Sequence, residues 1–421
     1  MILLRKLLRT AWSYKAQFIS MILMMSLGIG IFLGFSMEWK TIESDTARFF
    51  EDTKYADYRL YSESGFTTDD LNAIASIDGV NAATRYLSVN LEIKGDSKKS
   101  LVLDVSENFS VSTFDLMSGD EYDEQNDGVW LSDKFAKLNG IEIGDSLTLE
   151  FQGLDVPGEV VGLIKSGEHM ICVADSNQVM PDYNIFGYAY VSPEKLRAVI
   201  REKLRSTISG ELQQAGLPAA LANEQAEKLL TDALVREATD KAFVQINLRS
   251  DLQKAELEDA IKEKLGRTLM VVPKEDHLVY KEAMGEATEG KTMGSILPVL
   301  FLAIAILTMV TTMHRIATKE KTQIGVLKAL GFRSKRIGQL LISQNVWLTV
   351  IGVILGLPAG VGTLYWLLTA LAGEYEMKLM LGPLTYIVSV LLTFGVSLLV
   401  GWMLARKNRK IDMVEALKGA E

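Results

Sequence analysis

One stretch of this 421-residue sequence matches a phosphate-binding motif letter for letter. Residues 285–292 read G-E-A-T-E-G-K-T, which is the Walker A pattern. Such a loop works when a strand leads into it and a helix begins after it, because backbone N–H groups then surround the phosphates. Here the preceding residues are polar and helical in pattern, and Glu286 and Glu289 would repel a nucleotide. We therefore predict a junction between a helical stalk and a membrane span at this place, not a nucleotide site.

Other residues that often do chemistry are sparse. His169 and His277 are the only histidines between residues 38 and 292, and neither has a Cys, His or carboxylate at ligand spacing on a shared face. We interpret both as solvated surface residues and expect no metal site, cofactor or catalytic group, so the chain itself should not be an enzyme. Cys172 is the only cysteine, which excludes a disulfide within the chain.

Long apolar runs dominate the organisation of the chain. They cover residues 16–37 and about 293–313, 346–372 and 382–405, and none contains Asp, Glu, Lys or Arg. Each is long enough to cross a hydrocarbon layer of ~30 Å as a helix. The predicted fold class is an α-helical integral membrane bundle with an α+β extracytoplasmic domain on helical stalks. Its four transmembrane helices would be arranged as one before this domain and three after it.

These runs set the segment boundaries. We predict, in order, residues 1–15 as a cytoplasmic amphipathic segment, 16–37 as the first transmembrane helix, 38–292 as the extracytoplasmic domain with its stalks, 293–313 as the second helix, 314–341 as a cytoplasmic loop, 342–372 as the third helix, 373–382 as a short extracytoplasmic loop, 383–405 as the fourth helix and 406–421 as a cytoplasmic tail. A cleaved signal peptide over the first run is disfavoured, because no small-x-small cleavage site follows before Glu38.

The distribution of charge predicts an orientation. The whole chain carries −9, yet residues 1–15, 314–340 and 406–421 carry +4, +6 and +2, and residues 38–292 carry about −20. Lys and Arg collect in short loops on the cytoplasmic side of a membrane. Four spans place all three basic segments on one side. We therefore predict a bacterial cytoplasmic membrane protein with both termini in the cytoplasm and the acidic domain outside.

Within the outside domain, alternation and turn residues predict both strands and helices. Strand patterns occur at residues 55–61, 80–93, 100–105, 129–131, 146–151, 153–164, 243–248 and 268–272, and helix patterns at 68–77, 133–139 and 251–265. Residues 128–167 read as a small β-rich subdomain. Residues 193–242 read as a hairpin of two helices interrupted at Gly216-Leu217-Pro218. The polar segments 38–53 and 274–290 are expected to extend the first two spans as helical stalks.

The loop at residues 314–341 contains a short amphipathic pattern. Ile324, Leu327 and Leu330 fall three residues apart, the lysines lie mostly off that side, and Gly331 is suited to end the helix. A helix on the membrane surface and a helix in a partner's groove both explain the pattern.

Small residues recur four apart in two of the apolar runs, as Gly30 and Gly34 and as Gly352, Gly356 and Gly360. Such faces let helices approach closely. Packing within one subunit and contact between two subunits predict the same pattern. No ionisable residue lies inside any of the four runs, which disfavours a carrier driven by protons or ions.

The same loop resembles a known family. Glu320 and the run I-G-V-L-K-A-L-G at residues 324–331 are similar to the E-I-G-V-L-[RK]-A-L-G segment of the MacB/FtsX-type permeases of ABC transporters. Residues 131–149 and 411–418 resemble that family's outside domain and C-terminal end, whereas the 193–242 hairpin looks like an addition. The resemblance implies that an ATPase is coupled through Glu320, Ile324, Gly325, Leu327, Lys328, Ala329, Leu330 and Gly331.

The resemblance also implies a function. The chain would be a permease subunit that couples ATP hydrolysis by a separate cytoplasmic ATPase dimer to movement of its outside domain, for export or extraction of a lipophilic or peptide-like substrate. Its other partners would be a second permease copy or paralogue and membrane lipids, with an extracytoplasmic protein as a further possible partner and no nucleic acid. The alternative is a signalling or scaffold protein that regulates an extracytoplasmic partner such as a cell-wall hydrolase. A place as one unit of a longer two-unit permease also stays open.

Overall fold

The structure is a computed structural model that describes residues 9, 12–151, 154–174, 181–319, 321–371 and 383–408. The chain divides into a helical unit, Met1–Asp45 with Gly285–Glu421, and a sheet unit, Thr46–Met284. In the described residues, four helical segments are long and apolar enough to cross a membrane: Lys15–Asp52, Leu278–Ile316, Val346–Thr369 and Tyr386–Met403. This confirms the predicted class, a membrane helix bundle joined to an α+β domain. The one-plus-three topology across a membrane stays a prediction.

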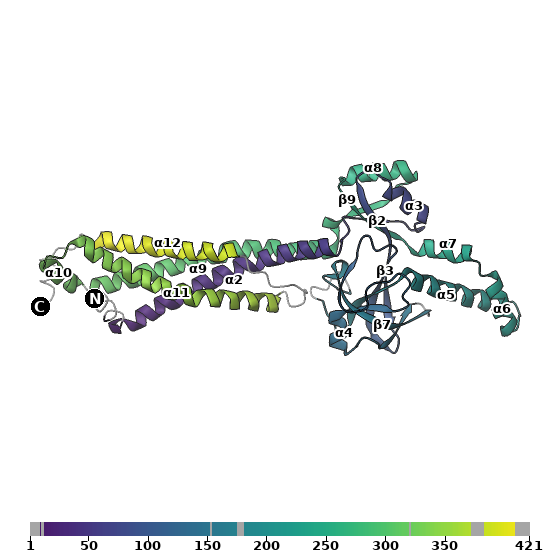
Figure 1. Ribbon diagram of the computed structural model, residues 1–421, viewed down its shortest axis with the longest axis horizontal. Helices are drawn as coiled ribbons and strands as arrows, with labels where there is room; N and C mark the ends of the chain where they lie inside the picture. The colour runs from purple at the N-terminus through teal and green to yellow at the C-terminus, as the bar shows by residue number, and fades with distance from the viewer. Residues whose placement is uncertain are drawn as a thin grey trace. The chain divides into compact units, whose positions relative to one another are not determined.

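Long helices make up the helical unit (Figure 1). They are α2 (Lys15–Asp52), α9 (Leu278–Lys319), α11 (Ser334–Leu371) and α12 (Pro383–Asn408), with the short α10 (Lys321–Ala329) between α9 and α11. The first apolar run and the polar residues after it form one unbroken helix, α2, and α9 is likewise unbroken from its polar start through the second run. Buried apolar side chains of α2, such as Met21 and Leu33, form the inside of the bundle.

The glycines singled out in the sequence lie where α2 packs against α11: Gly30, Gly34, Gly352, Gly356 and Gly360. A Cβ atom added to Gly356 would lie 2.8 Å from Cβ of Ile29, and one added to Gly360 would lie 2.7 Å from Cβ of Leu33. The backbones are close enough for Ser26 Oγ to donate a hydrogen bond of 3.2 Å to the carbonyl oxygen of Gly352. Both glycine series therefore make a close helix contact within one chain.

The strands of the sheet unit form one mixed sheet. In the described residues it has ten strands in the order β10-β1-β9-β2-β3-β8-β5-β7-β4, with β6 pairing with β2 and β7. The pairs β3–β8 and β5–β7 are parallel, and the others are antiparallel. The strands are β1 (Tyr58–Tyr61), β2 (Val80–Ile93), β3 (Asp96–Ser106), β4 (Phe114–Gly119), β5 (Val129–Ser132), β6 (Ser146–Phe151), β7 (Leu154–Ser166), β8 (Phe186–Val191), β9 (Gln245–Ser250) and β10 (Met270–Pro273).

Two apolar cores stabilise this sheet. One lies where α3 (Thr68–Ala75) and α8 (Lys254–Leu265) pack on β1, β9 and β10, around Leu60, Ile246 and Leu257. The larger core surrounds Trp130 and Phe135 and includes α4 (Asp133–Asn139). Short 3₁₀ turns, η1 (Gly167–His169) and η2 (Lys274–Asp276), follow β7 and β10. Residues 128–167 are thus part of the common sheet and not a separate β-rich subdomain.

The segment predicted as two helices contains three, α5 (Pro193–Gln214), α6 (Ala219–Leu229) and α7 (Asp232–Ala242). The additional break arises because the Thr231 side chain accepts a hydrogen bond from the backbone N–H of Leu234 and starts a new helix. The three helices extend from the sheet in Figure 1. Buried Arg85 of β2 connects α7 to the sheet, because it forms ion pairs with Asp240 of α7 and with Glu107, which follows β3.

Candidate functional site

The segment between α9 and α11 contains the residues to which the family resemblance gave a role in ATPase coupling. The helix α10 (Lys321–Ala329) ends at Gly331, whose φ of +85° is left-handed. The N–H of Gly331 donates to the carbonyl oxygen of Lys328 at 3.0 Å, and that of Phe332 donates to the carbonyl oxygen of Leu327 at 3.0 Å. This pair of bonds is a Schellman motif, so Gly331 terminates the helix and fixes the direction of the residues after it.

The predicted coupling residues differ in how exposed their side chains are. Ile324 is 3% exposed, and Gly325 is also buried. Leu330 is 70% exposed and lies after the end of α10, so it does not share a face with Ile324 as the three-residue spacing suggested. Leu327 and Lys328 are half-buried, Ala329 is exposed, and Glu320 lies outside the described residues.

Three apolar side chains are exposed on this loop and form what we call the loop patch: Val326, Leu330 and Phe332, which are 43%, 70% and 44% exposed. Sequence reasoning missed Val326 and Phe332, because it followed a strict spacing of three. The exposed cations Arg333, Lys335 and Arg336 come directly after the patch. An apolar patch bordered by cations is suited to docking against a protein surface, and it holds no group that could act as an acid, base or nucleophile.

The Walker A-like residues 285–292 lie within the helix α9. Their backbone N–H groups are therefore directed along the helix and do not form a loop that could surround phosphates.

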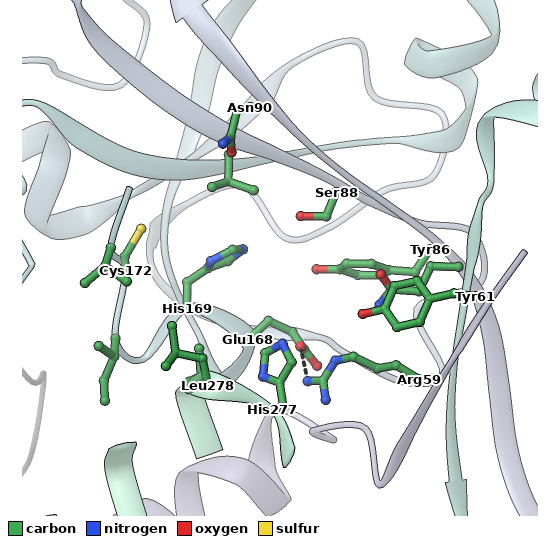
Figure 2. Close-up of a pocket in the computed structure, with 15 residues that line it drawn as sticks. Arg59, Tyr61, Tyr86, Ser88, Asn90, Glu168, His169, Cys172, His277 and Leu278 are labelled. Atoms are coloured by element: carbon green, nitrogen blue, oxygen red, sulfur yellow. Dashed lines mark hydrogen bonds and ion pairs between the residues drawn. The ribbon is translucent and has the colours of Figure 1, made fainter. Parts of the chain in front are cut away.

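The two histidines of the sheet unit do not lie on a solvated surface, so the interpretation drawn from the sequence is wrong. The side chain of His169 is 13% exposed, stacks on Tyr188 with ring centroids 4.7 Å apart, and pairs through Nε2 with the carboxylate of Asp104. His277 is half-buried, and its Nδ1 lies 2.7 Å from the hydroxyl of Tyr55. More than 100 residues separate them in sequence, yet both line one cavity (Figure 2).

Two family models match the sequence. The MacB-like periplasmic core domain matches residues 18–264, and the FtsX-like permease C-terminal domain matches residues 295–413. The first match alone covers more than half of the chain. The chain belongs to the MacB/FtsX family of ABC transporter permeases. This confirms the resemblance seen in the loop and describes a multi-pass membrane subunit of an ABC transporter.

Two solved structures are similar to part of this chain. The extracellular domain of the noncanonic ABC-type transporter YknZ from Gram-positive bacteria is 12% identical with a TM-score of 0.31, and the match covers 52% of this chain and 99% of that chain. The periplasmic region of MacB from Actinobacillus actinomycetemcomitans is 13% identical with a TM-score of 0.29, and the match covers 53% and 91%. A comparison with curated protein sequences finds no match.

The two histidines of the permease differ in protonation at neutral pH, because their pKa values are shifted in opposite directions. Burial opposes the charge of His169, but the adjacent Asp104 carboxylate outweighs it and raises the pKa to about 10. Burial, together with the positive charge of Arg59, lowers the pKa of His277 to about 4. Arg59 also holds the pKa of buried Glu168 below its usual range, against the effect of burial. His169 is therefore charged and His277 neutral.

These shifts predict a stability optimum for the sheet unit near pH 6.5. The folded state binds a proton at His169 that the unfolded state releases above pH 6.5, so stability falls as the pH rises from there towards about 10. At His277 the unfolded state binds the proton first, so stability falls as the pH drops from 6.5 towards about 4. The check is the urea midpoint at which sheet-unit peptides lose hydrogen-exchange protection, measured across this range. The variant His277→Phe should flatten the acid side alone, and an unchanged acid side would contradict the assignment.

Proposed function

We propose that this permease couples a separate cytoplasmic ATPase to movement of its sheet unit outside the membrane. The observation that carries the proposal is the loop patch, because Val326, Leu330 and Phe332 expose apolar surface in a loop that must lie in water if α9 and α11 cross the membrane. The fully buried centre of a docking surface is more apolar than its rim, and a few central residues supply most of the binding energy. The ATPase would cover this patch.

The proposed topology places the four candidate spans as one before and three after the sheet unit, with both termini and the loop patch in the cytoplasm. The basic character of the segments at residues 1–15, 314–340 and 406–421 supports this orientation. Residues 38–292 carry a charge of about −20. This fits a domain outside the cytoplasm, because the preference of Lys and Arg for the cytoplasmic side applies to short loops and long domains are translocated largely regardless of charge. The membrane would be the bacterial cytoplasmic membrane.

Continuous helices provide the proposed transmission. α2 contains the first candidate span and ends at Asp52 in the sheet unit, and α9 begins at Leu278 in the sheet unit and contains the second. An α-helix transmits displacement along its axis, because the hydrogen bonds between successive turns resist stretching and compression. Movement of the cytoplasmic ends would therefore reach the sheet unit, and a lipophilic or peptide-like substrate would be exported or extracted there without crossing through the bundle.

The proposed assembly contains an ATPase dimer and a second permease copy or paralogue, because one loop patch serves one ATPase subunit. Apolar side chains along α9, including Ile296, Val299 and Leu307, are more than half exposed in the single chain. Lipid or the second permease would cover them.

The variant Leu330→Asp tests the coupling assignment. A buried carboxylate in the ATPase contact would lack a partner, so stimulation of the co-purifying ATPase by the permease should fall by about tenfold or more. The measurement is the rate of ATP hydrolysis by the ATPase in the complex captured from its native membrane, compared with the rate of the same ATPase alone.

The matched control is Gln323→Asp, which adds the same charge at an exposed polar position of α10. It should keep stimulation near the unmodified level, and both variants should insert into the membrane normally. Full stimulation with Leu330→Asp would remove the loop patch from the ATPase contact.

A further inference from the structure

The helices α5 and α7 lie side by side where they join the sheet (Figure 1). A cavity of about 380 Å³, which we call the arm cavity, lies between them next to Arg85 of β2 and Thr68 of α3. This volume is within the range for small-molecule sites. Four arginines and three carboxylates line it: Arg85, Arg197, Arg201, Arg236, Glu194, Asp232 and Asp240. The lining is therefore net positive, in a domain that carries about −20 over residues 38–292.

Arg236 of α7 is an exposed cation without a carboxylate partner among the described residues. Asp232 and Asp240 lie four residues before and after it, at the spacing where pairs form along a helix. Both are engaged elsewhere, because Asp232 pairs with Arg201 of α5 at 2.5 Å and Asp240 pairs with Arg85 of β2. The guanidinium of Arg236 is thus open to an anion that enters the arm cavity.

Arg197 and Arg201 of α5 add accessible donors, since the side chains of both are nearly half exposed. Each makes one bond to a solvated carboxylate, Arg197 to Glu194 at 2.6 Å and Arg201 to Asp232 at 2.5 Å. A guanidinium has five N–H donors, and ion pairs this exposed contribute little free energy. A doubly charged ligand can therefore compete for these arginines. Arg85 is different, because it is buried and already bonded to two carboxylates.

We propose that the arm cavity binds a phosphate monoester. The phosphate group lies between Arg236 on one helix and Arg197 and Arg201 on the other, and the organic part lies against Ala198 and Val235. Three guanidinium groups offer more donors than the two oxygens of one carboxylate can accept, whereas a phosphate monoester presents three oxygens and up to two charges. The site does not depend on the proposed ATPase contact, because all of its residues belong to the sheet unit.

Binding of phenyl phosphate to the full-length permease in phosphatidylcholine nanodiscs tests this proposal. Saturation-transfer NMR should show phenyl phosphate binding, with benzoate, an anion of lower charge, bound about fivefold or more weakly. The acidic domain as a whole repels the higher charge more, so a preference for the phosphate reflects the local arginines. Failure of phenyl phosphate to bind at millimolar concentration, or equal binding of benzoate, overturns the proposal.

A phosphate monoester can be a soluble ester or the headgroup of phosphatidic acid. Nanodiscs in which phosphatidic acid replaces part of the phosphatidylcholine distinguish these two sources. We expect them to bind phenyl phosphate with unchanged affinity, because the lining of the arm cavity contains only two apolar residues, Ala198 and Val235, to receive an acyl chain. Displacement of phenyl phosphate would assign the site to the lipid headgroup and overturn the soluble source.

The variant Arg236→Gln locates the site. It should weaken the binding of phenyl phosphate about tenfold, because it removes a charged donor that no carboxylate of the protein holds. The matched control is Arg205→Gln, which removes the same charge from α5, where Arg205 pairs with Glu202 at 2.5 Å and does not line the cavity. This control should leave binding unchanged. Equal weakening by both variants would reduce the effect to the overall charge and overturn the proposal.

The variant Glu194→Gln tests the same site through a gain of binding, which a folding defect cannot produce. It removes the carboxylate that competes for Arg197, so the affinity for phenyl phosphate should rise about threefold. Glu202→Gln removes the corresponding partner of Arg205 and should have no effect. An unchanged affinity in Glu194→Gln, or an equal rise in Glu202→Gln, places the ligand elsewhere and overturns the proposal.

Discussion

Replacing Glu168 by alanine will destabilise the sheet unit by about 3–5 kcal/mol, which is the usual cost of removing one member of a buried ion pair. Arg59 and Glu168 are 1% and 6% exposed, so the guanidinium would be left charged in a water-poor interior. Ser112 would also lose the acceptor of its hydroxyl, and that hydroxyl in turn accepts from Asn247 Nδ2 at 2.7 Å. The loss therefore affects a network that joins β1, β9 and η1.

Hydrogen exchange of the full-length protein measures this effect locally, as the urea midpoint at which β1 and β9 peptides lose protection. The double variant Arg59→Met with Glu168→Leu should recover most of the loss, because an apolar pair of similar volume is often neutral. Asp155→Ala is the surface control, since its partner Lys94 is 53% exposed, and it should leave the midpoint unchanged. Equal midpoints for Glu168→Ala and Asp155→Ala would show that the buried pair contributes no more than a surface pair.

Gly356→Leu will separate α2 from α11 and lower the thermal stability of the helical unit by roughly 5–10 °C, which corresponds to a few kcal/mol of overpacking. A Cβ atom at this position would lie 2.8 Å from Cβ of Ile29 and 3.1 Å from the carbonyl oxygen of Ser26. The second contact is with backbone, so a side-chain rotation cannot relieve it. The helices must move apart and lose the packing on both sides of the contact.

Gly362→Leu is the matched control on the same helix, because a Cβ atom there meets nothing within 4 Å. It should be neutral or slightly stabilising, since leucine favours a helix more than glycine does. Size-exclusion recovery after heating in one detergent compares the two variants. Equal losses would mean that the glycine contact within the chain does not limit stability.

Local sequence patterns predicted the helices and strands that have one apolar and one polar face. β2 and α4 have the predicted bounds, because their alternation and caps are encoded within the segment itself. β8 was missed, since all six of its residues are buried and a short strand covered on both faces shows no alternation. β4 was missed as well, and it lies at the sheet edge with mostly exposed side chains.

The candidate sites depended on the tertiary structure to different degrees. The loop patch could be found in part, because Leu330 and the glycine stop are neighbours in sequence. Exposure then distinguished Leu330 from buried Ile324, and spacing alone cannot supply that distinction. The cavity of Figure 2 could not be found at all. Arg59, Glu168 and His277 come from segments about 110 residues apart, and isolated charged residues read as solvated surface.

The sequence by itself determined the four candidate membrane spans, the basic segments and the family, because hydrophobic length, charge placement and a short motif are properties of contiguous residues. Only the tertiary structure decided which glycines meet within one chain, which apolar residues of the loop remain exposed and how His169 and His277 are charged. Those properties arise from distances between residues far apart in the chain. A pKa, a close approach or a cavity is set by neighbours in space, and strand order places those neighbours without leaving a pattern in any one segment.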